Sequence, residues 1–468
     1  MEFAQLASWQ GLLHFGGLSI LMLLANVMRR KIPFLRRSLL PTAVIAGFIG
    51  LAIKETLFIP VFGQTQYDVT LSTLRLITYH AIALGFIALG LKSADAVKLK
   101  LNNNKSMFSG LLIVSTYLLQ GLIALSLTIV FSYTLFTALF PAAGMLFPLG
   151  FGQGPGQAHN IGSLYEVDYG FVGGTSFGLA IASFGFLWAS IAGVIYLNTL
   201  VRKKQLIRQK EHKSGLISSQ EIEGPDEIPV AEAIDKFTVQ TALVLTVYVI
   251  TFAFIYGVVS LMQAGALGNF GVETVAPLIV GFNFIVGMLF ALLFKRIFIG
   301  LRKMNLMTRQ YPNNYMLNRI AGTVFDFMIV SAITAIRIED LRGLWAPFLI
   351  ISFIIGIVTL IYVVKMTRRI YPEYPIEASL GMFGMLTGTA STGVVLLREA
   401  DPNFETPAAN DLVVGSTTAI MFGFPVLLLV GIAPRSGLST WLTLGIIVVL
   451  TALVVGILLK LNPKQANS

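Results

Sequence analysis

The chain has 468 residues, of which 55% are hydrophobic and only 12% are charged, and its mean hydropathy is +0.79. Soluble domains carry about 25% charged residues, so a soluble fold of this length is excluded. The absence of cysteine excludes disulfides, thiolate catalysis and Cys-ligated metal sites. A formal net charge of +10 would favour nucleic acid as a partner of a soluble protein, but in a membrane protein it marks the cytoplasmic loops, so no nucleic-acid partner is expected.

Apolar runs long enough to cross a hydrocarbon core recur along the whole chain, whereas a β-barrel would show short alternating segments. We therefore predict an all-α polytopic membrane protein with about eleven transmembrane helices. The expected spans are 8–28, 38–54, 72–91, 107–131, 172–200, 238–262, 276–300, 315–337, 344–366, 411–433 and 439–460.

The basic residues set the expected topology. Most of the 33 Lys and Arg residues fall in alternate loops, beginning with Arg29, Arg30 and Lys31 after the first span. This cluster follows the first apolar run, whereas a cleaved signal peptide has its basic residues in front. We predict a multi-pass protein of the plasma (inner) membrane with its N-terminus outside and its C-terminus cytoplasmic.

The segment 132–171 breaks the simple alternation, because the flanking charges require it to begin and end outside. Its second part, Gly150–Gly162, is too polar and glycine-rich for a lipid-facing helix. Non-helical backbone at membrane depth is tolerated only where it is buried in protein or lines a wet cavity. We therefore predict a re-entrant hairpin at about 132–165.

A similar glycine- and threonine-rich stretch, Gly381–Gly393, predicts a second hairpin at about 376–399 that enters from the cytoplasmic side. Each half then holds five transmembrane helices and one hairpin, in opposite orientations. The expected organisation is an N-terminal repeat at 1–200, a charged cytoplasmic linker at 201–237, an inverted C-terminal repeat at 238–433 and an additional helix at 439–460. Inverted-topology repeats with interrupted helices are typical of secondary transporters.

The hairpin tips are the predicted binding site. A half-helix that begins at membrane depth presents free N–H groups and a positive dipole end to an anion, and neutral oxygens suit Na⁺. The expected substrate-binding residues are Gly154, Gly156, Gln157, Asn160, Gly388, Thr389, Ser391 and Thr392; the expected sodium-binding residues are Gln153, Ser163, Thr175, Ser176, Thr387, Ser416 and Thr417. The alternative role for such small residues is close helix packing.

Two ionisable residues are further candidates. His159 lies within the first tip, and Asp326 lies within the span 315–337, where a carboxylate binds a cation or pairs with Arg319. Walker loops, zinc-protease motifs and Ser/His/Asp arrangements are missing from the sequence, so we expect no enzyme and no cofactor apart from Na⁺ as a coupling ion.

The tips resemble those of the sodium/glutamate symporter family. Gly152–Ala158 stands in place of that family's Gly-His-Gly-Thr-Gly-Ala-Ala-like tip, and Leu386–Thr392 resembles its Gly-x-Gly-Ala-Thr-Pro-Thr pattern. Further matches are Tyr169-Gly170-Phe171, Phe184-Gly185-Phe186 and Pro41–Gly47. The departures are Gln153 for the family histidine, Pro155 for its threonine, and Ala390 or Ser391 for its second-tip proline.

This resemblance implies an inverted-repeat fold with two hairpins, a homodimer, and Na⁺-coupled import of glutamate by an elevator-like movement. We expect Na⁺-coupled symport of glutamate or a related small carboxylate, with Na⁺, membrane lipid and a second copy of the chain as the other partners. The alternative is an H⁺- or Na⁺-coupled carrier of another organic anion such as a hydroxycarboxylate. A channel or a membrane enzyme ranks behind both.

Overall fold

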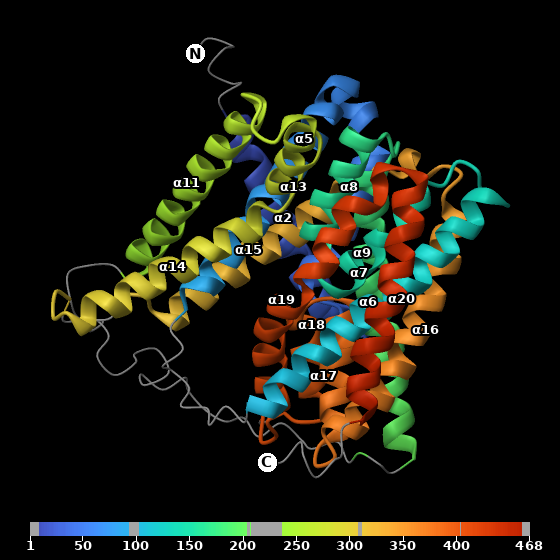
Figure 1. Cartoon of the computed structure of the whole chain (residues 1–468). Helices are drawn as coiled ribbons and strands as arrows, with labels where there is room; N and C mark the ends of the chain where they lie inside the picture. Colours follow the sequence, from blue (N-terminus) through green and yellow to red (C-terminus); the bar gives the residue numbers. More distant parts are fainter. Residues whose placement is uncertain are drawn as a thin grey trace. The chain divides into compact units, whose positions relative to one another are not determined.

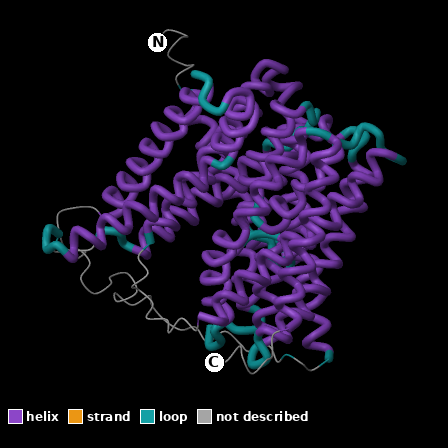
Figure 2. The backbone as a smooth tube through the Cα atoms, viewed as in Figure 1, coloured by secondary structure: helices purple, strands orange, loops and turns teal. Residues whose placement is uncertain are grey.

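The computed structural model describes residues 9–92, 103–203, 206, 236–307, 311–402 and 404–460, and these residues form helices, turns and loops without a strand (Figure 2). Among them, nine helical segments are long and apolar enough to cross a membrane. The protein is therefore a multi-pass membrane protein. The nine segments are Gln10–Lys31, Thr42–Leu91, Met107–Tyr133, Gly174–Arg202, Lys236–Gln263, Asn283–Lys303, Asn314–Thr334, Trp345–Ile370 and Gly437–Lys460.

Most of the expected spans coincide with helices, with three differences. The span 276–300 is divided at Phe282 between a short helix, α13 (Ala276–Gly281), and α14 (Asn283–Lys303). The spans 38–54 and 72–91 belong to one continuous helical segment made of α4 (Thr42–Ile53), a π-helical turn at Lys54–Phe58 and α5 (Ile59–Leu91). The segment kinks at Gly63, whose φ of 81° is open to glycine and disfavoured for other residues. The span 411–433 forms α19 (Ala408–Ile432), which is not among the nine segments. The structure does not describe four of its side chains. The exact number of crossings stays a prediction.

The chain divides into two compact units. The first comprises Met1–Leu71, Leu101–His212 and Ala332–Ser468, and the second comprises Ser72–Lys100 and Lys213–Ser331. Each unit thus takes segments from both halves of the chain. The organisation expected from the sequence divides the chain into consecutive segments, whereas these units are groups of residues in contact, so that expectation stays a prediction. Most residues of its linker, 201–237, are not described by the structure.

In the first unit, long helices surround two pairs of short ones, and we call this assembly the hairpin bundle (Figure 1). Helix α6 packs against α16, α19 and α20, while α9 packs against the short helices α7, α8 and α17. Small residues permit this packing: a Cβ on Gly162 of α8 would lie 2.5 Å from the carbonyl oxygen of Gly174 in α9. The bundle comprises α6 (Asn103–Tyr133), α7 (Leu146–Gly152), α8 (Pro155–Tyr169), α9 (Gly174–Arg202), α16 (Trp345–Ile370), α17 (Pro375–Thr387), α18 (Ala390–Arg398), α19 and α20 (Gly437–Lys460).

The two predicted hairpins appear as broken helix pairs. Helices α7 and α8 are separated at Gln153-Gly154, and α17 and α18 at Gly388-Thr389. The first broken element begins later than expected, with a 3₁₀ turn at Pro141–Met145, because α6 continues to Tyr133. Helices α17 and α18 approach so closely that a Cβ on Gly384 would lie 2.8 Å from the Cα of Gly393.

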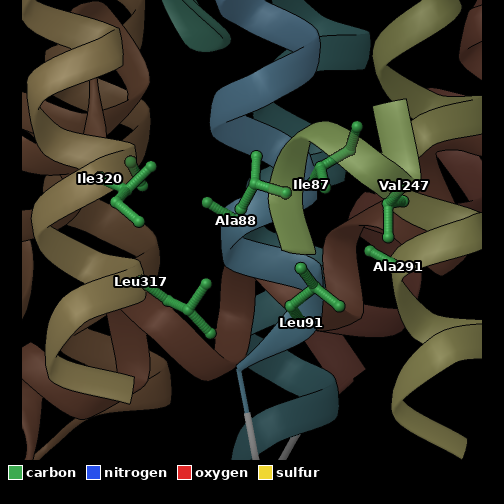
Figure 3. Close-up of a cluster of buried hydrophobic side chains, with 9 residues drawn as sticks. Ile87, Ala88, Leu91, Val247, Ala291, Leu317 and Ile320 are labelled. Carbon is green, nitrogen blue, oxygen red and sulfur yellow. The ribbon is translucent and has the colours of Figure 1, made fainter. Parts of the chain in front are cut away.

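The second unit contains α11 (Lys236–Gln263), α14 (Asn283–Lys303), most of α15 (Asn314–Thr334) and the second part of α5. Figure 3 shows Ala88 and Leu91 of α5 between Leu317 and Ile320 of α15 on one side and Val247 and Ala291 on the other. His80 of α5 also shares a hydrogen bond with the hydroxyl of Tyr248 in α11. Aliphatic packing around α5 therefore forms the core of this unit.

Candidate functional site

The two helix breaks touch each other inside the hairpin bundle. A Cβ built on Gly154 would lie 3.2 Å from Thr389 Cγ2 and 3.8 Å from the carbonyl oxygen of Gly388. Gly154 has φ 93° and ψ −176°, a conformation that only glycine adopts readily. We call this meeting point of Gly154 and Thr389 the tip contact. Figure 2 shows short loop segments enclosed among the helices of the bundle.

The helices that follow the two breaks, α8 and α18, both begin at the tip contact. The first main-chain bond of α8 runs from Ala158 N–H to Gly154 O (3.3 Å), so the N–H groups of Gly156 and Gln157 precede it. In α18, Gly393 N–H donates to Thr389 O (3.0 Å), so the N–H groups of Ser391 and Thr392 precede that bond. Early N–H groups have no intrahelical acceptor and carry the positive end of the helix dipole. Two such ends meeting at one point favour an anion.

The helices that precede the breaks, α7 and α17, end there with carbonyl groups that have no donor within their own helix. Helix α6 supplies a side-chain donor to each of them. The hydroxyl of Tyr117 donates to the carbonyl oxygen of Gly152 at the end of α7 (2.9 Å). The side-chain amide of Gln120 donates to the carbonyl oxygen of Leu386 near the end of α17 (3.0 Å). Residues three apart lie on one face of a helix. One face of α6 therefore supports both breaks.

Side-chain oxygens line the same region. The hydroxyls of Thr389 and Thr392 lie 3.3 Å apart, at the start of α18. The amide oxygen of Gln157 is buried and has no hydrogen-bond partner among the described residues. A buried acceptor left without a donor costs about 1–3 kcal/mol, which is recovered if a ligand supplies the donor.

The structure brings most of the expected substrate-binding residues to the tip contact. Thr392 is buried there, whereas Ser391 and Ala390 are exposed, so the start of α18 is the more accessible of the two helix ends. Asn160 and His159 lie one turn further along α8, both buried, with His159 Nδ1 3.2 Å from Asn160 Oδ1. The residues located at the breaks are Gly154, Gly156, Gln157, Gly388, Thr389, Ser391 and Thr392.

The expected sodium ligands are spread over several places. Gln153 caps the end of α7 at the tip contact. The hydroxyl of Thr387 donates back to Phe383 O (2.6 Å), and that of Ser416 donates to Leu412 O (2.7 Å). Ser163 is half-buried on α8, beyond Asn160. The side chain of Thr417 lies outside the part of the chain that the structure describes.

Thr175 and Ser176 lie in the first turn of α9, next to the last part of α8 and not to its start. Thr175 N–H donates to a carboxylate oxygen of Glu166 (2.9 Å), and the hydroxyl of Ser176 donates to Asp340 Oδ2 (2.7 Å). Glu166 follows Gly154 by about three helical turns, so these two residues are not brought to the tip contact.

Asp326 belongs to the second unit, where it is exposed on α15. No ion pair with Arg319 occurs among the described residues; the guanidinium of Arg319 lies over the ring of Tyr315 instead, 5.1 Å from its centroid. The described residues also contain no group of three His, Asp or Glu side chains that could hold a metal ion.

Tyr117 and Gln120, which support the two breaks, were not predicted from the sequence. A glutamine inside an otherwise apolar span was the available signal, because polar side chains at membrane depth face protein or water. Nor was Lys54 predicted, which is almost completely buried, 2.6 Å from Glu55 Oε1 and 2.6 Å from the carbonyl oxygen of Ile336.

Comparison of the chain with models of known protein families finds no match. Comparison with curated proteins likewise finds no matching relative.

Proposed function

We propose that this protein is a secondary active transporter that carries glutamate or a related small carboxylate together with Na⁺. The observation that carries the proposal is the tip contact, where the N-terminal ends of α8 and α18 meet at Gly154 and Thr389. Main-chain N–H groups from two broken helices provide a carboxylate with several donors without a permanent charge. A site of that kind binds an anion and can also release it.

The arrangement of the helices supports transport over the other classes. In each half, a long helix, a broken pair and another long helix follow in the same order: α6, α7–α8 and α9, then α16, α17–α18 and α19. This order supports the proposed inverted repeat, with a re-entrant hairpin in each half. Broken helices in corresponding positions place substrate and ion sites at membrane depth in secondary transporters. A channel or a membrane enzyme does not require two such breaks in contact.

The proposal includes the membrane, the orientation and the oligomeric state of the transporter. The distribution of basic residues supports an inner-membrane protein with its N-terminus outside and its C-terminus cytoplasmic. The resemblance of the tips to those of the sodium/glutamate symporters supports a homodimer that works by an elevator-like movement.

Uptake into proteoliposomes tests this function. With an inward Na⁺ gradient, we expect concentrative uptake of glutamate or another small carboxylate, and we expect none when choline replaces Na⁺. Equal flux without accumulation would indicate a channel. Absence of Na⁺-dependent accumulation for every acidic amino acid and dicarboxylate would reject the proposal.

A second candidate is an H⁺- or Na⁺-coupled carrier of another organic anion such as a hydroxycarboxylate. It is favoured by Gln153 and Pro155, which stand where the resembling family has histidine and threonine, directly at the tip contact. Replacing the Na⁺ gradient by a proton gradient in the same assay, with hydroxycarboxylates as substrates, separates the two functions.

A further inference from the structure

We infer that Gln120, Thr359 and the main-chain carbonyl of Leu386 form a binding site for the coupling Na⁺, separate from the substrate site at the tip contact. The inference rests on the proposed function and adds the location of one ion. Three different helices contribute: Gln120 lies on α6, Thr359 on α16 and Leu386 on α17. All three residues are at most 2% exposed.

The geometry of the three groups suits a small cation. Gln120 Nε2 lies 3.0 Å from Thr359 Oγ1 and 3.0 Å from Leu386 O, so one point lies within hydrogen-bond distance of a hydroxyl and a main-chain carbonyl. An amide N–H₂ group is a donor, and here it bridges the hydroxyl and carbonyl oxygens that would bind a cation. Hydroxyl and carbonyl oxygens without a carboxylate favour a monovalent ion, since Mg²⁺ and Ca²⁺ sites in proteins draw on carboxylates.

The oxygen of the same amide lacks a donor in the part of the chain that the structure describes. Gln120 Oε1 is buried and has no hydrogen-bond partner among the described residues. A half turn of the terminal amide exchanges the positions of its nitrogen and oxygen. In the turned orientation, Gln120 Oε1 takes the position of Nε2 next to Thr359 Oγ1 and Leu386 O, so three neighbouring oxygens are available to one cation. The amide donor therefore fills the site when the ion is absent, and the amide oxygen binds the ion when it is present.

The position of Leu386 connects this site to the substrate site. Leu386 lies two residues before the break at Gly388, and α18 begins directly after Thr389. An ion held by Leu386 O therefore orders the end of α17 and, through the short break, the N–H groups at the start of α18. Ion binding at this site should increase substrate affinity, and substrate binding should increase Na⁺ affinity by the same factor, because the two events share one segment of backbone.

Thermal unfolding of the purified full-length protein in detergent tests the site without substrate. Titrating NaCl against choline chloride at constant ionic strength should raise the unfolding temperature of the wild-type protein with a saturable Na⁺ dependence. Gln120→Leu and Thr359→Val each remove one oxygen ligand. We expect each to raise the half-saturating Na⁺ concentration by about tenfold or more. Thr359→Ser keeps the hydroxyl and should stay close to the wild-type value.

Two matched variants control for the loss of a buried polar group. Gln240 is equally buried, but both ends of its amide are bonded, to Tyr311 O (2.7 Å) and to Asn313 N–H (3.1 Å). Thr367 lies on the same helix as Thr359, and its hydroxyl donates to Val363 O (2.8 Å). Gln240→Leu and Thr367→Val should lower the unfolding temperature while leaving the half-saturating Na⁺ concentration unchanged.

The outcomes separate this inference from the proposed function. Na⁺-driven uptake in proteoliposomes with an unchanged half-saturating Na⁺ concentration in Thr359→Val and Gln120→Leu would overturn the site and leave the transporter intact. A wild-type protein without any Na⁺-dependent uptake would reject the proposed function itself. If Gln120→Leu does not fold, the pair Thr359→Val and Thr359→Ser decides the question, because equal Na⁺ dependence in both overturns the site.

Discussion

The hydroxyl of Tyr117 donates a hydrogen bond to the carbonyl oxygen of Gly152 across 2.9 Å, and its ring packs so closely on Gly152 that no side chain fits there. This contact joins α6 to the first helix break at the point where α7 ends. A main-chain carbonyl released by a broken helix is thereby bonded without water.

Tyr117→Phe removes this donor and keeps the ring. We expect a loss of about 1–2 kcal/mol in the free energy of unfolding, because a buried carbonyl is left without a partner. Transport should also slow, since the first tip loses its support. Chemical unfolding and proteoliposome uptake measure the two effects. Tyr256→Phe changes an exposed side chain on α11 and should leave both unchanged, and equal behaviour of the two variants would contradict the role of Tyr117.

Gly154→Ala tests the tip contact. The backbone of Gly154 lies in a region reserved for glycine, so a side chain there costs about 1–3 kcal/mol, and its Cβ would also press against Thr389. We expect folded protein with little or no substrate transport.

Gly170→Ala is the matched control for that variant. Gly170 also has a positive φ, 72°, but a Cβ there meets nothing within 4 Å. Backbone strain of about 1–2 kcal/mol is expected without loss of transport. If both variants transported equally well, the tip contact would be a packing feature only.

The ion pair between buried Lys54 and partly exposed Glu55 is expected to stabilise the first unit. Lys54→Met leaves Glu55 without the ammonium group 2.6 Å away and should cost on the order of 2–4 kcal/mol, somewhat below the range for fully buried pairs because Glu55 is 20% exposed. The double variant Lys54→Met/Glu55→Leu should recover part of this loss. Unfolding free energies of the two single variants and the double variant give the coupling, and strictly additive values would show that the pair contributes nothing.

The Tyr374 hydroxyl, between α16 and α17, donates to Asp411 Oδ2 (2.6 Å) in the first turn of α19. The pKa of Tyr374 is raised, mainly by burial and to a smaller extent by the hydrogen bond to Asp411. The hydroxyl therefore stays protonated in the folded protein. A group with a raised pKa keeps its full contribution to stability below its unfolded value, about 10 for tyrosine, and loses it only above that pH. Tyr374→Phe should therefore lower the unfolding temperature by an amount that is constant between pH 6 and pH 9. A difference that changed steeply within this window would contradict the assignment of the proton to Tyr374.

Local properties of the sequence were sufficient to predict most of the long helices and the positions of the two breaks in the hairpin bundle. Apolar runs of membrane-spanning length predict helices wherever they occur, because lipid leaves the backbone no other partner. Gly154 and Gly388 stand in polar, glycine-rich stretches, and both predicted breaks occur there. The helical stretch at 54–71 was not predicted, since its composition is mixed and its kink depends on one residue, Gly63.

The partners of each break, by contrast, were decided by tertiary structure. Thr175 and Ser176 have suitable chemistry for an ion site, but the length of α8 carries them away from the tip contact and toward Glu166 and Asp340. Gln120 reads in the sequence as one polar residue in an apolar span, and only the packing of α6 against α17 gives it the carbonyl of Leu386 as a partner. Span length, polarity and glycine content are properties of neighbouring residues and can be read along the chain. Which side chain meets which free carbonyl depends on contacts between residues far apart in the sequence, and one sequence alone does not contain that distance information.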